Sequence, residues 1–318
     1  MHAFLYRLNY NRQDYIFATY KNSSDEIVSI PYIANGIYQI VLSLGNVNYD
    51  QGQTDIIQYI KDKYPVSENI CNACMKIGRI VKHVWRPGYI DHKNPLEIEP
   101  YEETKSKKEL GLLIKRLEDI ILYIEPDEKT IETYGHKTRE LLLLSCTEFE
   151  SRWLHYLNIS GNIINRPTTN DYIKIKDKLF LHEYEICFSS HPYSINICPF
   201  KNWDTESPTQ SLPFYHSYNK LKHDTYQFFS QATLYNCIIS IMANIVMHCV
   251  RYSPYSLLEG KDTCSTLFNE YFSIKLVDPS INTFYVPHIK SVQMASGAFS
   301  APPGSTFSED WIIDNFTI

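Results

Sequence analysis

The chain has 318 residues, of which 44% are apolar and 21% are charged. This composition predicts a folded core and argues against a disordered or low-complexity chain. The formal net charge of −6 argues against a broad basic surface of the kind that binds nucleic acid without specificity.

The cysteines and the apolar runs indicate the compartment. The eight cysteines lie at irregular spacing, which indicates reduced thiols in a cytoplasmic protein. The N-terminus has no charged segment followed by a long apolar run, so we expect no signal peptide. The longest apolar stretch, residues 237–250, is shorter than the ~20 residues of a membrane helix and contains Ser240, Asn244 and His248. We therefore expect a core helix and no membrane association.

Residues 1–85 predict a small mixed α/β region. Two β-prone runs, 15–20 and 27–30, flank a turn-rich segment and predict a hairpin. A short helix is predicted over residues 54–64, because Thr54 suits a helix start and a proline follows.

A second helix is predicted over residues 67–85, followed by a linker. Its apolar residues recur at helical spacing, and they are Ile70, Cys74, Ile77, Val81 and Val84. Residues 86–103 then carry three prolines and several charges, which predicts a linker and a domain boundary.

Residues 104–252 predict a bundle of long helices. Apolar residues at helical spacing mark four segments, at about 104–125, 130–157, 211–224 and 230–252. Between them, alternating residues predict an exposed β-hairpin inserted at about 183–200. Residues 253–318 predict an irregular C-terminal extension that packs on the body. The expected fold class is α+β and mainly helical.

Two groups of polar residues in the predicted helices are candidates for a site. Asn219 and His223 lie four residues apart and share a helix face, with Lys222 beside them. Imidazole moves protons near neutral pH, and cations stabilise developing negative charge, so this group suits chemistry on phosphate. The alternative is a solvated helix end.

The second group places Arg139 and Glu150 on one face of a very apolar helix. Each needs a partner, because an unpaired buried charge is costly. Eleven residues of helix separate them by about 16 Å, so partners on the facing helix, Lys222 or His223, are attractive. A structural network of buried ion pairs is the alternative to catalysis.

Metal and cofactor motifs are absent from the sequence. Cys71 and Cys74 precede His83 and His92, but the histidines are nine residues apart and no second cysteine pair follows. We interpret these cysteines as core residues. No Gly-rich phosphate loop, GxSxG or HExxH motif occurs. We expect no cofactor and no metal.

Two segments resemble a known superfamily. Residues 134–150, and residues 213–224 followed by Ala232-Thr233-Leu234, resemble a group of bacterial proteins whose helical core looks like the HEPN superfamily. The resemblance covers about residues 104–252. It implies a helical bundle, often dimeric, that in many members is a metal-independent ribonuclease of toxin–antitoxin or phage-defence systems. Asn219 and His223 match the polar-then-His part of the motif, whereas Tyr218 stands where the motif has Arg.

The resemblance implies two alternative functions. In the first, the protein is a ribonuclease acting on RNA. His223 is then the acid or base at the ribose 2′-hydroxyl, Lys222 and Arg139 stabilise the phosphorane, Asn219 orients phosphate, and Glu150 orients a cation. In the second, the protein is a non-catalytic or antitoxin-type interaction protein that forms a homodimer or binds a partner protein.

Overall fold

The computed structural model has a mainly helical α+β fold, as the sequence predicts. It describes residues 2–10, 13–21, 26–35, 39–42, 48–51, 55–87, 99–161, 164–286 and 311–318. The chain divides into two compact units. The first contains residues 1–82, 86–96 and 278–314, and the second contains residues 83–85, 97–277 and 315–318.

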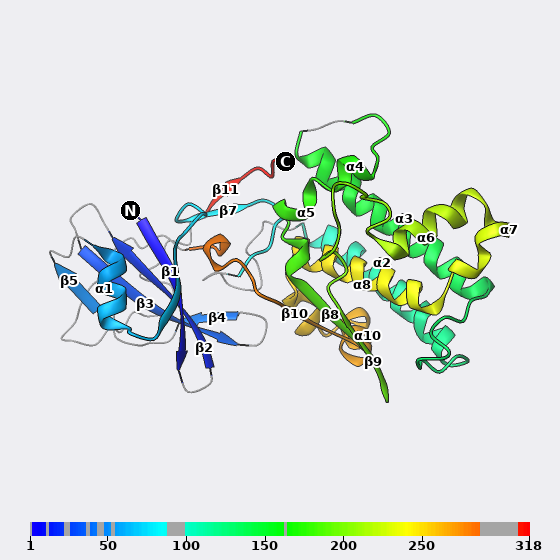
Figure 1. The fold of residues 1–318 in the computed structure, drawn as a ribbon, viewed down its shortest axis with the longest axis horizontal. Helices are drawn as coiled ribbons and strands as arrows, with labels where there is room; N and C mark the ends of the chain where they lie inside the picture. Colours follow the sequence, from blue (N-terminus) through cyan, green and yellow to red (C-terminus); the bar gives the residue numbers. More distant parts are fainter. Residues whose placement is uncertain are drawn as a thin grey trace. The chain divides into compact units, whose positions relative to one another are not determined.

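The first unit is built on an antiparallel sheet of six strands (Figure 1). The strands are β1 (His2–Tyr10), β2 (Gln13–Lys21), β3 (Glu26–Asn35), β4 (Gln39–Leu42), β5 (Asn48–Gln51) and β6 (Ser67–Asn72). Their order is β4-β3-β2-β1-β6, and β5 also pairs with β3. The register of β2 and β3 pairs Tyr20 with Val28, so the predicted hairpin is confirmed. Helix α1 (Ile56–Lys63) is capped by Asp55, whose carboxylate accepts from the amides of Ile57 and Gln58.

The predicted helix over residues 67–85 is wrong. Strand β6 pairs with β1, and β7 (Arg79–Val81) pairs in parallel with β11 (Ile312–Asp314). Asn69, Gly78 and His83 have positive φ angles of 54°, 70° and 62°, which a helix does not contain. Pairing with a distant strand therefore outweighed the helical period. Cys74, expected in the apolar stripe, is exposed.

The second unit is a bundle of four longer helices. These are α2 (Pro100–Ile121), α3 (His136–Ile159), α6 (Pro213–His223) and α8 (Leu234–Tyr252). All four match predicted helices. Helix α3 begins later than predicted because the carboxylate of Asp127 accepts from the amides of Lys129 and Thr130, which holds a turn before it. Helix α8 begins at Leu234 because Thr233 caps it through the amide of Asn236.

Helix α8 is the core of the bundle. Among the residues that the structure describes, it alone has the length and apolarity of a membrane span. Within its most apolar window, 89% of the residues are buried inside the protein. A core helix of a soluble protein has this property, as the sequence analysis predicts for residues 237–250.

Shorter elements complete the second unit. They are α4 (Thr169–Tyr172), α5 (Ile175–Lys178), the 3₁₀ turns Leu181–Glu183 and Phe229–Gln231, α7 (Thr225–Phe228), α9 (Tyr255–Leu258) and α10 (Thr263–Tyr271), with strands β8 (Tyr184–Ser190), β9 (Tyr193–Ile197) and β10 (Phe272–Leu276). Residues 253–276 are therefore largely regular, which corrects the expectation of an irregular extension. Residues 287–310 of that extension lie outside the described part of the chain.

Strands β8 and β9 pair antiparallel, within the range expected for a hairpin. They are not a free exposed hairpin, because β10 pairs along the other edge of β8. Tyr184, Ile186 and Phe188 on the inward face of β8 are fully buried. The expectation of exposure was wrong because the strand that covers this edge, β10, was not predicted.

Candidate functional site

Glu150 of α3 is the centre of a polar cluster between α3 and α6. The hydroxyl of Tyr215 donates to its Oε1 at 2.6 Å, and the hydroxyl of Tyr218 donates to its Oε2 at 3.2 Å. The ammonium of Lys222 lies 3.9 Å from Oε2 and donates to the Tyr218 hydroxyl at 3.2 Å. The predicted partnership of Glu150 with Lys222 across the facing helices is therefore confirmed.

The pKa shifts of the tyrosines and of Lys222 favour the hydrogen bonds of this cluster. Burial, and then the hydrogen bond to Glu150, raise the pKa of Tyr215 far above its usual value. Burial also raises the pKa of Tyr218. The Tyr218 hydroxyl raises the pKa of Lys222. At neutral pH the phenols keep their protons as donors and Lys222 keeps its charge, so these groups bind one another.

The other predicted site residues lie outside this cluster. His223 is exposed at the end of α6, and Asn219 is half-buried one turn earlier. Arg139 is half-buried near the start of α3, and its Nε is buried without a hydrogen-bond acceptor. Among the described residues, no hydrogen bond or ion pair joins these three to Glu150 or Lys222. Of the five predicted residues, the structure brings together only Glu150 and Lys222.

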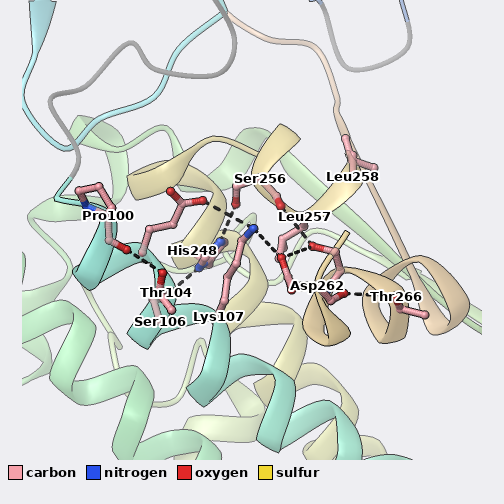
Figure 2. A network of polar contacts seen from close by, with 12 residues as sticks. Pro100, Thr104, Ser106, Lys107, His248, Ser256, Leu257, Leu258, Asp262 and Thr266 are labelled. Carbon is pink, nitrogen blue, oxygen red and sulfur yellow. Dashed lines mark hydrogen bonds and ion pairs between the residues drawn. The ribbon is translucent and has the colours of Figure 1, made fainter. Parts of the chain in front are cut away.

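A second polar cluster, not predicted as a site, lies where α2, α3 and α8 meet. Figure 2 shows His248 of α8 between the hydroxyls of Ser106 and Ser256. Its Nδ1 is 2.9 Å from Ser106 Oγ, and its Nε2 is 2.8 Å from Ser256 Oγ. Arg152 of α3 donates to Ser106 Oγ at 2.7 Å and to Asn244 Oδ1 at 3.1 Å. These contacts join all three helices through polar groups.

The direction of one hydrogen bond in this chain is fixed. Arg152 can only donate, so Ser106 Oγ accepts from it. A neutral imidazole carries one proton, so His248 donates to one of the two serines and accepts from the other. Burial, and then the charges of Arg152 and Lys107, lower the pKa of His248 well below its usual value. The imidazole is therefore neutral at physiological pH.

An ion pair at the edge of this cluster connects α10 to α2. The ammonium of Lys107 donates to Asp262 Oδ2 at 2.9 Å, as Figure 2 shows. The same carboxylate caps α10 by accepting from the amide of Ser265 at 3.0 Å. The link fixes the start of α10 against the side of α2.

The pairing of Ser256 with His248 has the components of nucleophilic catalysis. A general base works best when its pKa is near the operating pH, and His248 lies well below. The other imidazole nitrogen, Nδ1, faces the hydroxyl of Ser106 rather than a carboxylate. These contacts favour a role of His248 in holding the helices together over that of a general base. The sequence carried a signal for it, because Ser240, Asn244 and His248 interrupt an apolar run at four-residue steps.

Metal ligands do not cluster in the residues that the structure describes. No three His, Cys, Asp or Glu side chains lie there in an arrangement that could hold an ion. Cys74 instead accepts a hydrogen bond from the side-chain amide of Asn282 at 3.1 Å.

A pocket of about 570 Å³ lies between the C-terminal end of α2 and the start of α3. Its lining residues are Arg116, Asp119, Ile120, Tyr123, Ile124, Lys137, Glu140 and Leu141. Tyr123, one of these residues, is 90% exposed, Leu122 before it is 73% exposed, and Leu112 in the middle of α2 is 49% exposed. This surface, which we call the α2 face, is apolar with charged residues among its apolar ones.

Comparison with protein-family models, with curated proteins and with solved structures returned no match.

Proposed function

We propose that the protein is a non-catalytic, HEPN-like interaction protein that binds another protein through the α2 face. The observation that carries this proposal is the solvent exposure of Tyr123, which lines a pocket, together with that of Leu122 and Leu112. Exposed apolar side chains that include an aromatic residue are typical of protein interfaces. The HEPN-like character rests on the two sequence segments that resemble that superfamily.

The polar clusters support a non-catalytic role. Glu150 accepts from two tyrosines and lies beside Lys222, so its carboxylate is not a free base. His248 is fully buried and neutral. These groups connect helices of the bundle, whereas Leu112, Leu122 and Tyr123 are exposed.

The test compares two tyrosine variants by size-exclusion chromatography of fresh, clarified lysate. We expect the parent to elute above its own mass of 37.2 kDa and Tyr123→Asp to elute at that mass, because a charge is placed in the apolar interface. Tyr226→Asp is the control, because Tyr226 is fully exposed on another element, and it should elute with the parent. The proposal would be contradicted if the parent eluted at 37.2 kDa. It would also be contradicted if Tyr123→Asp eluted at the same, larger mass as the parent.

One observation favours the ribonuclease as a second candidate. The last turn of α6 carries Lys220, Lys222 and His223, and Tyr226, which follows, is fully exposed. Cations beside an exposed aromatic ring suit a single strand of RNA. If His223 is the acid or base, His223→Ala should lower the rate of RNA cleavage by about 100-fold or more. His216→Ala on the same helix should cleave as the parent does, and equal rates for all three proteins would refute the candidate.

A further inference from the structure

Four exposed residues of the α2 face form one line. Leu112, Arg116 and Asp119 of α2 and Tyr123 of the turn that continues it are separated by four, three and four residues, which is the spacing of a single helix face. All four side chains are exposed. Neither Arg116 nor Asp119 has a hydrogen bond or an ion pair among the described residues. Both charges are therefore available to a partner.

The order of these residues is self-complementary. A two-fold axis that crosses α2 between residues 117 and 118 places position n opposite position 235 − n of a second copy. Arg116 then faces the partner's Asp119, and Leu112 faces the partner's Tyr123. By symmetry each contact occurs twice, so one axis satisfies both charges and both apolar side chains.

The pocket supports the same arrangement. Tyr123 is one of its lining residues, as are Arg116 and Asp119. An aliphatic side chain placed opposite Tyr123 meets the apolar wall formed by Ile120, Ile124 and Leu141. Leu112 of a second copy is such a side chain, half exposed in the single chain and available for burial.

We infer that the occupant of the α2 face is a second copy of this chain, bound through antiparallel α2 helices with Arg116 paired to the partner's Asp119. This inference rests on the proposed function, because it names the partner at the same surface. Charge complementarity selects the second copy. An unrelated partner would not require that the two halves of one helix face match each other.

The experiment measures the mass of purified full-length protein by sedimentation equilibrium over a range of concentrations. We expect the parent to form a two-chain species. Arg116→Asp should weaken it about tenfold or more, because two like-charge pairs replace two ion pairs. The double variant Arg116→Asp/Asp119→Arg should restore it, because the reversed charges again face each other. Lys178→Asp, an equal charge change on α5, is the control and should leave the mass unchanged.

Mixing separates this inference from the proposed function. The double variant should pair with itself but not with a differently tagged parent, because like charges would then face one another. Failure of the double variant to restore association, or equal pairing with the parent, overturns the inference. A purified parent that remains a single chain, while complexes in lysate still depend on Tyr123, overturns the second copy and leaves the proposed function standing.

Discussion

At the scale of single residues, the structure places two uncharged imidazoles inside the second unit. His248 is fully buried between two serines, and His155 of α3 is largely buried beside His83, with 5.5 Å between ring centroids. Burial, and then nearby positive charge, lower the pKa of His155 to about 4. Burial acts in the same direction on His248. Both groups thus take up a proton more readily in the unfolded chain than in the folded one.

This difference predicts a loss of stability in mild acid. The unfolded imidazoles bind protons below about pH 6.5, whereas the folded His155 does so only near about 4. The contribution of the uncharged histidines to the free energy of unfolding is therefore fully present above pH 6.5, and it falls as the pH drops from 6.5 toward 4. Each histidine contributes a slope of at most ~1.4 kcal/mol per pH unit to the free energy of unfolding. Urea unfolding at pH 7.5, 6 and 5 measures this slope.

A variant tests the assignment of this slope. In His248→Gln the side chain still hydrogen-bonds but does not titrate, so the dependence on pH should be shallower than in the parent. A slope that is the same in both proteins would show that His248 does not cause it.

At this scale the sequence predicted the pairing of Glu150 with Lys222 but not the tyrosines around it. The cost of burying Glu150 predicted a partner on the facing helix, and Lys222 is that partner. Tyr215 and Tyr218 also bind the carboxylate, and they were not predicted because a tyrosine ring fits the same apolar stripe as Phe or Leu. The predicted roles of His223, Asn219 and Arg139 stay predictions.

At the scale of elements, the local pattern predicts a helix well when the helix buries one face. Helices α2, α3, α6 and α8 were predicted because their apolar spacing agrees with their packing. Strands β6 and β7 were missed because their partners, β1 and β11, are distant in sequence. Pairing of this kind leaves little trace in a short window of residues, so β10 was missed for the same reason.

The junction of α2, α3 and α8 depends on Arg152. Its replacement in Arg152→Met removes donors to Ser106 and Asn244 and leaves both without that partner inside the bundle. We expect the free energy of unfolding to fall by about 3 kcal/mol, as measured by urea titration. The exposed Lys137→Met serves as control and should change it by less than about 0.5 kcal/mol. An Arg152→Met protein as stable as the parent would mean that the cluster contributes little.

At the scale of the whole molecule, the buried face of α2 and the face proposed for association are different. Its inward residues Leu110, Leu113, Ile114 and Leu117 are buried in the core, whereas Leu112, Arg116 and Asp119 face solvent. Variants of the outward residues should therefore change the state of association without changing the folding of a single chain. The helical spacing of the inward apolar residues is visible in the sequence. The outward stripe became recognisable only when the exposure of Leu112 and Tyr123 was known.

The last eight residues take part in both units. Ile312–Asp314 form the strand beside β7, and Asp314 pairs with Arg79 at 2.8 Å, while the ring of Phe316 lies 5.3 Å from that of Tyr156 in the helical unit. An affinity tag or reporter fused directly after Ile318 would crowd this short segment. Removing residues 312–318 would disturb two cores at once.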